Sequence, residues 1–301
     1  MAPLTDNLRG ALLMMGGMVA FTCNDALVKS LGDEMPMLQV LSLRGLITTF
    51  VLGLLAARLG QIRYRPARSD RRLIALRAVA EVASAWMFMT ALFNMPLANA
   101  SAIMQSLPLA VTLMGALVLG EAVGWKRVGA ILVGFVGVLL IVQPGGEGFN
   151  LYSVMVLGAV GWVTVRDLAA RRMTQAVPSV FVAFVTSSGV TLMSLMASVL
   201  VDWQPVTGSS ALRLGAAALF LVVGYVCLVS AMRVGEIGIV APFRYASLIA
   251  ALILGLVVFG TFPGPLALAG AALVVGSGLF TLYRERVTRR GHAAQALAAP
   301  R

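Results

Sequence analysis

The sequence predicts an all-α, polytopic membrane protein with ten transmembrane helices arranged as a 5+5 inverted repeat. Two observations on composition point to the membrane. Hydrophobic residues make up 59% of the 301-residue chain and charged residues only 12%, against about 25% in ordinary soluble domains. The third observation is a repeat, because polar residues and glycines of the first half recur at a fixed spacing in the second half.

Ten apolar runs lie between breaks formed by charged residues, proline and glycine. A bilayer core about 30 Å thick needs about 20 apolar residues in a helix. The first run is too long for the apolar core of a typical signal peptide, so we interpret it as a retained span. The ten expected spans are residues 8–31, 36–57, 73–94, 97–119, 126–143, 150–166, 178–201, 211–232, 238–260 and 264–283.

Lysine and arginine are distributed unequally between the two faces of this topology. Ten spans place both termini on one face, and eighteen of the 23 basic residues, Arg166 among them, fall on that face. Lys29 and Arg213 fall on the other face, and the remaining three fall within spans. The positive-inside rule therefore predicts cytoplasmic termini. It also accounts for the net charge of +11 without nucleic-acid binding, which needs a basic patch on a solvated surface.

The two halves of the chain share chemically distinctive residues. At a spacing of 142 or 140, the matches are Asp25 with Asp167, Lys29 with Arg171, Pro36 with Pro178, Gly115 with Gly255 and Gly120 with Gly260. We therefore expect an N-terminal repeat over 1–145, a C-terminal repeat over 146–290 and a disordered basic tail over 291–301. Because each repeat has five spans, the second enters from the opposite face, as in many secondary transporters that bind substrate between their halves.

The chain lacks the residues of several other function classes. No G-x4-G-K-[ST] phosphate loop occurs, so we expect no ATP hydrolysis. The single histidine, His292, lies in the tail, and Cys23 and Cys227 lie apart in apolar runs. We therefore expect no metal, no cofactor and no catalytic residues. A membrane-embedded enzyme and a channel are the weaker alternatives, because neither clustered ligands nor a ring-forming motif is visible.

The end of the fourth span and the fifth span carry a family pattern. Pro108 precedes Gly120–Glu121 in the form P-x7-11-GE, and residues 125–141 read WKRVGAILVGFVGVLLI. With the five-plus-five repeat, these residues make the chain resemble the drug/metabolite transporter superfamily, in its ten-helix EamA-type branch. The resemblance extends over nearly all of residues 8–283. Within that branch the chain is most similar to the bacterial aromatic amino-acid exporters. The resemblance implies an exporter of the bacterial inner membrane. The second half reads GTFPG (260–264) without the acid, so we interpret Glu121 as a helix-end residue.

Three charged residues are expected at membrane depth, Arg44, Glu81 and Arg244, with Asp25 nearer the outer end. Such charges cost about 2.5–3.5 kcal/mol on insertion scales and usually face the protein interior. One interpretation is a buried ion pair of Glu81 with Arg44 or Arg77. The other is a cavity lining that binds a zwitterion, with arginine on the carboxylate and the acid on the ammonium. The two interpretations are compatible if the charged residues pair with one another until the substrate binds.

Uncharged residues complete the candidate site. Pro108 is expected to break the fourth span and free a carbonyl near 104, unless it only bends the helix. The glycine- and alanine-rich runs 129–137 and 267–278 are expected to pack helices closely. Trp86 is displaced from the helix face of Glu81. The predicted substrate-binding residues are Arg244, Tyr245, Glu81, Arg44, Trp162, Gln105, Asn24 and Trp86.

The predicted function is export of amino acids, aromatic and other neutral ones, by alternating access without ATP. Two central arginines with one acid fit a zwitterion better than a phosphate, which favours several cations. The alternative cargo is another metabolite or drug, such as a nucleotide sugar, a triose phosphate or a cationic drug. Passive export and proton coupling through Glu81 or Asp25 are both open. Ten spans can enclose a cavity, so a monomer is sufficient and a dimer is not required; the expected partners are the substrate and the lipid bilayer.

Overall fold

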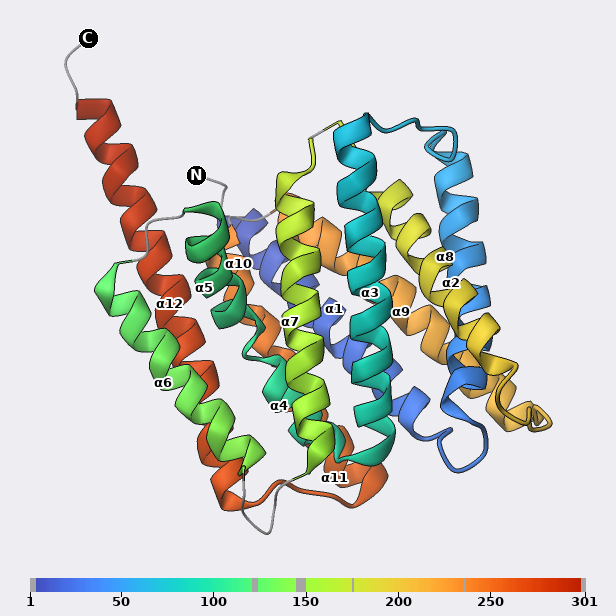
Figure 1. The fold of residues 1–301 in the computed structure, drawn as a ribbon. Helices are drawn as coiled ribbons and strands as arrows, with labels where there is room; N and C mark the ends of the chain where they lie inside the picture. The colour runs from blue at the N-terminus through green and yellow to red at the C-terminus, as the bar shows by residue number, and fades with distance from the viewer. Residues whose placement is uncertain (1–3, 121–123, 145–149, 175, 235–236, 299–301) are drawn as a thin grey trace.

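The computed structural model describes residues 4–120, 124–144, 150–174, 176–234 and 237–298, and these residues form helices and connections without a strand (Figure 1). Glu121, which we expected at a helix end, lies outside the described residues. The helices are α1 (Leu4–Lys29), α2 (Met37–Arg58), α3 (Arg68–Asn94), α4 (Leu97–Met104), α5 (Leu107–Leu119), α6 (Trp125–Val142), α7 (Leu151–Arg172), α8 (Ser179–Ser198), α9 (Gly208–Val234), α10 (Ile237–Val240), the 3-10 helix η1 (Ala241–Tyr245), α11 (Ala246–Phe259) and α12 (Pro265–Ala298).

Ten segments of the described chain are long and apolar enough to cross a membrane, which confirms the predicted fold class. Each overlaps one expected span. The sixth differs at its end, because α7 continues to Arg172. Arg166 therefore lies inside a helix, which corrects its assignment to the basic face. α12 continues to Ala298, so the tail is helical from 291 to 298 rather than disordered as expected.

Two of the ten spans are broken within the membrane. Pro108 lies in the first turn of α5, where its missing N–H leaves no helical bond unmade, and Gln105 and Ser106 separate α5 from α4. This confirms the predicted break. The second break was not predicted: Pro242 lies at the start of η1, which separates α10 from α11 and contains Arg244.

The two broken spans end in the same backbone conformation. α5 ends at Gly120 with φ 69°, and α11 ends at Gly260 with φ 62°. Glycine adopts this left-handed conformation without strain, and its N–H bonds back to the carbonyl group of Gly115 or Gly255, respectively. These four glycines are the ones that match at a spacing of 140, so the repeat in the sequence recurs as a repeat in local structure.

Helices of the two halves pack on one another in exchange-related pairs. α1 packs along α9 as α7 packs along α3, while α2 packs on α8 and α6 on α12. When the two halves are exchanged, the α1–α9 pair becomes the α7–α3 pair. The α2–α8 pair and the α6–α12 pair each become themselves. α1 begins at the end of the bundle where α7 ends, so these equivalent helices run in opposite directions (Figure 1). An inverted repeat produces this arrangement; the residue boundaries of the two repeats stay a prediction.

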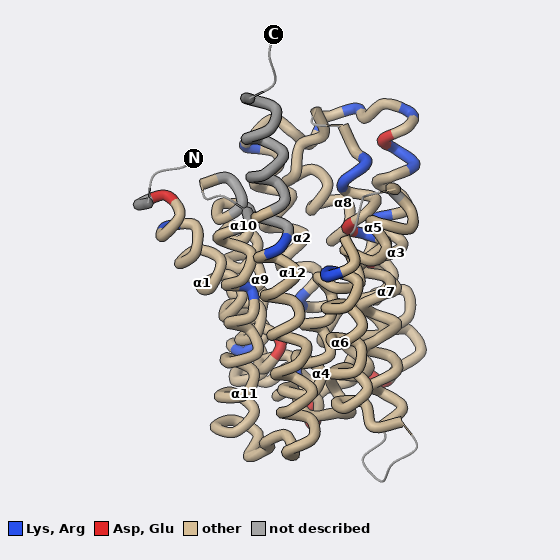
Figure 2. Tube along the Cα trace, turned by 90° about the vertical axis from the view of Figure 1, so that its left-hand side faces the viewer, with Lys and Arg blue, Asp and Glu red and all other residues tan. Residues whose placement is uncertain are grey.

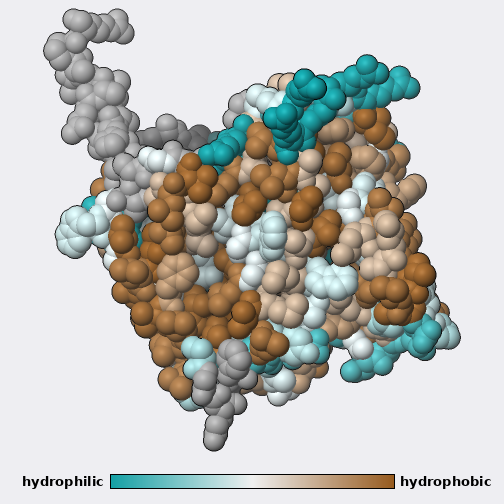
Figure 3. Space-filling model, in the orientation of Figure 1, coloured by the Kyte–Doolittle hydropathy of each residue, from teal (hydrophilic) through white to brown (hydrophobic). Residues whose placement is uncertain are grey.

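The two ends of the bundle differ in charge. We call the end where α1 begins and α12 ends the terminal end, and the opposite one the distal end (Figure 1). Lysine and arginine gather at the terminal end (Figure 2). The space-filling view shows a hydrophobic band between two hydrophilic ends (Figure 3). A band of this kind is the surface expected of a chain that spans a bilayer.

A single hydrophobic cluster, which we call the distal plug, lies at the distal end. It joins the connection after α1 and the adjoining ends of α1, α2, α3 and α4 to residues of α9 and α11 from the second half. Its buried members are Ala26, Val28, Leu31, Met35, Val40, Leu41, Met89, Leu92, Leu97, Leu214, Ala217 and Ala251. The plug therefore packs side chains from both halves together at the distal end.

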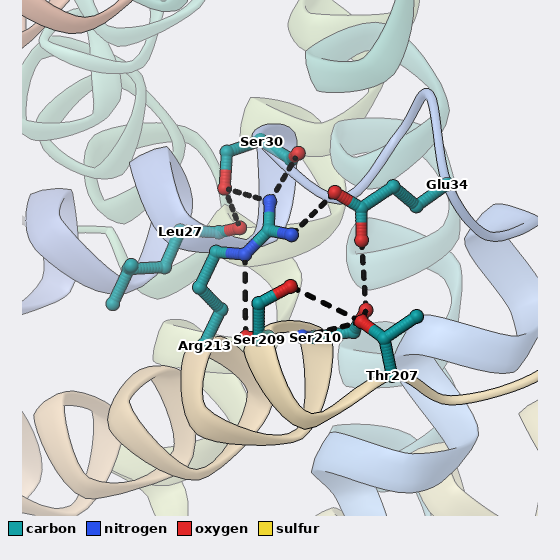
Figure 4. A network of polar contacts seen from close by, with 7 residues as sticks. All are labelled: Leu27, Ser30, Glu34, Thr207, Ser209, Ser210 and Arg213. Atoms are coloured by element: carbon teal, nitrogen blue, oxygen red, sulfur yellow. Dashed lines mark hydrogen bonds and ion pairs between the residues drawn. The ribbon is translucent and has the colours of Figure 1, made fainter.

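A polar network fastens the connection after α1 to the start of α9, next to the distal plug (Figure 4). Arg213 forms an ion pair with Glu34 and donates to the carbonyl oxygen of Ser30 at 2.9 Å. The Ser210 hydroxyl donates to the second carboxylate oxygen of Glu34 at 2.7 Å. Because these hydrogen bonds favour the ionised form, they hold the pKa of Glu34 below its ordinary value.

Candidate functional site

A cavity of about 340 Å³ lies between the two halves. Residues of α1 to α5 line it together with residues of α7, α8, α9, η1 and α11. Its volume is at the lower end of the roughly 300–1,000 Å³ that small-molecule pockets occupy. The charged residues of its wall are Asp25, Arg44, Glu81, Arg166 and Arg244.

Arg166 lies between two acids. Its Nη1 atom is 3.3 Å from both carboxylate oxygens of Glu81, and its Nε atom is 2.9 Å from Oδ1 of Asp167. Arg77 donates to the carbonyl oxygen of Arg166 at 3.5 Å. An ion pair of Glu81 is thus present, but the partners expected from the sequence, Arg44 and Arg77, were wrong. The packing of α3 along α7 brings Glu81 to Arg166 instead.

On α1 and α2, an amide links two charges of opposite sign. Arg44 Nη1 donates to Oδ1 of Asn24 at 3.0 Å, and Nδ2 of Asn24 donates to Oδ1 of Asp25 at 2.9 Å. Arg44 is 7% exposed and its Nε atom is buried without a hydrogen-bond partner. Asp25 is half-buried at the cavity wall. Arg44 and Asp25 are therefore joined through a neutral group rather than in a direct ion pair.

Arg244 reaches the cavity from η1, the turn between α10 and α11. Its side chain is half-buried. Among the described residues, its guanidinium takes part in no hydrogen bond and no ion pair, in contrast to Arg166. A guanidinium group binds carboxylates through paired hydrogen bonds, so this charge is available to an anionic group in the cavity.

Repeat-equivalent residues meet at two points beside the cavity. Gln105 Nε2 donates to Oγ of Ser247 at 2.6 Å, and the hydroxyl oxygens of Thr49 and Thr191 are 2.9 Å apart. The two members of each pair are 142 residues apart, which is the spacing of the repeat. A residue can touch its own repeat partner only near the axis that exchanges the halves, so the cavity lies beside that axis.

Five of the predicted binding residues line the cavity: Asn24, Arg44, Glu81, Gln105 and Arg244. The other three do not. Tyr245 is 6% exposed and packs against Gly278, and Trp162 is 37% exposed. Trp86 lines a separate apolar groove between α3 and α8. The structure thus separates the predicted aromatic residues from the charged cavity.

The structure adds residues that the sequence-based set lacked, namely Asp25, Arg166 and Tyr225. A signal for Arg166 existed, because it is the repeat partner of Asn24, but its closeness to the basic end of α7 placed it outside the span. Tyr225 lies in an apolar run of α9 and carried no signal; its ring contacts Phe21 edge-to-face, with centroids 5.4 Å apart.

The rest of the cavity wall is largely apolar. It includes flexible thioethers and aromatic rings, which adapt to apolar groups of varied shape; these are Met18, Phe21, Phe88, Met89 and Met104. No group of three histidine, cysteine, aspartate or glutamate residues that could hold a metal ion occurs in the described part of the chain. The site therefore combines charged groups for a polar headgroup with a wall for an apolar remainder.

A membrane-spanning bundle of two inverted halves around a charged cavity is the architecture of secondary transporters. Comparison with protein families gives a narrower result. The chain belongs to the EamA-like transporter family, whose model matches residues 8–143 and again residues 151–283. The two matches fall on the two halves of the molecule.

Similar proteins transport small molecules. The riboflavin transporter of Vibrio cholerae is 29% identical over 68% of this chain and 69% of its own length. The S-adenosylmethionine uptake transporter of Rickettsia bellii is 24% identical over 89% and 91%, and the pseudopaline exporter of Pseudomonas aeruginosa is 27% identical over 88% and 93%. A solved crystal structure, 20% identical, matches with a TM-score of 0.62 over 92% of this chain and 98% of its own, which supports the fold. The chain is therefore a multi-pass membrane protein of a small-molecule transporter family.

Proposed function

We propose that the chain exports zwitterionic molecules that contain an amino-acid group, aromatic and other neutral amino acids among them. The observation that carries this proposal is Arg244, which reaches the cavity and has no ion pair among the described residues. Arginine at membrane depth is expensive and marks substrate pathways. A substrate carboxylate would supply the anion that this guanidinium lacks.

In this proposal Asp25, rather than Glu81, faces the substrate ammonium. Glu81 is engaged by Arg166. The hydrogen bond that reaches Asp25 from Asn24 comes from a neutral amide, and Asp25 is half-buried at the cavity wall. Its carboxylate is therefore better placed than that of Glu81 to pair with a cation in the cavity.

Transport by alternating access without ATP fits two inverted halves, because one movement can close one end and open the other. We propose that the terminal end is cytoplasmic in the bacterial inner membrane. The support is the concentration of lysine and arginine at that end. One chain encloses the cavity, so a monomer suffices in this proposal.

The test is counterflow of labelled phenylalanine, tryptophan, methionine and threonine in proteoliposomes, with and without a pH gradient. Arg244→Gln is expected to lower the rate at least about tenfold, because a charge-assisted hydrogen bond contributes about 1.5–3 kcal/mol. Arg58→Gln, which removes an exposed arginine at the end of α2, is the matched control. Normal transport by Arg244→Gln would exclude the carboxylate role, and failure of the unmodified protein to transport any of the four would exclude this cargo.

S-adenosylmethionine is a second candidate cargo. A relative named for its uptake matches 89% of this chain, and the molecule contains an amino-acid group that the same charges would bind. In the counterflow assay, unlabelled S-adenosylmethionine and riboflavin serve as competitors. If S-adenosylmethionine inhibits more strongly than the four amino acids, the cargo is the larger molecule and the assignment of Arg244 stands.

A further inference from the structure

We infer that the cavity selects amino acids with a second anionic group, and that Arg44 binds this second group. The inference rests on the proposed function, in which Arg244 binds one carboxylate and Asp25 the ammonium. It adds a second anion site to the cavity and makes amino dicarboxylates and similar molecules the preferred members of the proposed substrate class.

The charge balance of the described residues around the cavity points to this class. Arg166 pairs with Glu81 and Asp167, and Arg77, which donates to the carbonyl oxygen of Arg166, adds a second positive charge near these two acids, so the four charges compensate one another. The remaining charges of the cavity wall are Arg44, Arg244 and Asp25. The carboxylate of a neutral zwitterion would neutralise one arginine and its ammonium would neutralise Asp25. The guanidinium of the other arginine would then remain without an anion. A substrate with two anionic groups and one ammonium balances all three.

The surroundings of Arg44 identify it as the guanidinium for the second group. It is 7% exposed, and its Nε atom is buried without a partner. Its one side-chain hydrogen bond within the described chain goes to the amide of Asn24, which carries no charge. The acid whose charge acts on Arg44, Asp25, is linked to it by hydrogen bonds only through that amide, and a buried N–H without a partner is unfavourable. An anionic group in the cavity would relieve this deficit.

Asn24 keeps the two charges of this wall apart. It is 2% exposed and bonds Arg44 with its oxygen and Asp25 with its nitrogen. Without this spacer the guanidinium and the carboxylate would be free to pair directly and cancel each other. With it, both charges stay available, one for an anion and one for an ammonium.

Glutamate and glutamine are the probes, because they have nearly the same size and differ in the second carboxylate. We would measure the concentration of each that stabilises the purified full chain against thermal unfolding, and the competition of each with labelled phenylalanine in counterflow. Glutamate is expected to bind at least about tenfold more tightly than glutamine, as one further charge-assisted contact allows.

Arg44→Gln is expected to reduce the preference for glutamate to within about twofold while glutamine binding is retained. Arg77→Gln removes the same charge from a residue outside the cavity wall and is expected to keep the preference. Equal loss in both variants would overturn the inference, because the preference would then reflect the overall potential. The comparison of the two probes in the unmodified protein needs no variant, so it tests the second anion site even if Arg44→Gln does not fold, and Arg44→Lys, which keeps the charge, then tests the assignment to Arg44.

The two proposals fail in different ways. Equal binding of the two probes by the unmodified protein, or binding of neither, overturns the second anion site. Absence of counterflow for phenylalanine, with clear stabilisation by glutamate that depends on Arg44, overturns export of neutral amino acids and supports the second anion site.

Discussion

At the scale of single residues, Glu34 shows how a charge outside the membrane fastens a connection. Hydrogen bonds from Arg213 and Ser210 lower its pKa in the folded protein. A carboxylate whose pKa is lower in the folded state stabilises the fold above its unfolded pKa, and this contribution is lost as the pH falls through the folded pKa.

Glu34→Gln is therefore expected to lower the melting temperature at neutral pH. The difference from the unmodified protein is expected to shrink below about pH 4, where the unfolded carboxyl group is protonated and the folded one begins to be. Thermal unfolding in detergent over a pH series measures this. Asp33→Asn, at the neighbouring exposed acid, is the matched control for the loss of one negative charge. A difference that stays constant down to about pH 3 would contradict the assignment.

Residue types of the site were easier to predict than residue partners. Charges inside apolar runs identified Arg44, Glu81 and Arg244 as interior residues, since a lipid-facing charge is unfavourable. The periodicity of a helix says which residues share a face but not which helix lies opposite. The partner of Glu81 was therefore missed, and Trp86 and Trp162 were included because tryptophan suits a cavity and a lipid-facing surface equally well.

At the scale of helices, α6 and α12 approach so closely that a side chain is excluded between them. A Cβ atom on Gly137 would lie 2.7 Å from the carbonyl oxygen of Gly270, while one on Gly129 would meet nothing within 4 Å. The glycine- and alanine-rich runs indicated this close packing in advance, because small residues let helices approach in lipid.

Gly137→Ala is expected to destabilise the protein by about 1–3 kcal/mol, because the methyl group forces α6 away from α12. Gly129→Ala, in the same helix, is expected to be neutral or to stabilise by up to about 1 kcal/mol, since alanine favours helix more than glycine does. Equilibrium unfolding of both variants in detergent makes the comparison. Equal effects would mean that the α6–α12 contact does not require glycine at 137.

The helix breaks were only half predicted. Pro108 lies in the middle of an apolar run, so its effect on the backbone was expected. Pro242 lies near the start of the expected span 238–260, where proline is ordinarily tolerated, and η1 was missed. As a result Arg244 was expected on a regular helix, whereas it lies in the turn that follows α10.

At the scale of the whole molecule, matched positions at the two ends of the bundle differ in burial. Four residues of the distal plug are buried while their repeat partners are exposed or half-exposed, whereas Ala26 and Met89 have buried partners, Leu168 and Ala231. At a spacing of 142 the four differing pairs are Val28 with Ala170, Leu31 with Met173, Leu214 with Arg72 and Ala217 with Ala75. At these four positions the distal end is therefore more tightly packed than the terminal end.

Thiol labelling tests this asymmetry. The background is a chain in which both cysteines, Cys23 and Cys227, are replaced by alanine. In it, Ala75→Cys is expected to react quickly with a membrane-impermeant maleimide, because residue 75 is exposed. Ala217→Cys is expected to react slowly, because residue 217 is 0% exposed. Inside-out vesicles are expected to show the fast reaction if the terminal end is cytoplasmic. Faster reaction at 217 would mean that the closed end is the terminal one.

The number of spans and the relation between the halves followed from the sequence, since apolar length and matched polar residues depend on local composition. Which end is closed did not follow. Both states are formed by the same residues and differ by only a few kcal/mol, so a pattern of residue types cannot favour one. The difference between the two ends lies in the burial of residues that are equivalent by the repeat.

The hydrogen bonds of Gln105 with Ser247 and of Thr49 with Thr191 each join a residue to its own counterpart. Swapping the conformations of the two halves keeps both members of such a pair beside the axis that exchanges the halves, so the two side chains stay neighbours. If the opposite state arises by that swap, the plug must come apart and a new one must assemble around Ala170, Met173 and Ala75. These two side-chain contacts would then persist in both states, at the axis about which the two halves rotate.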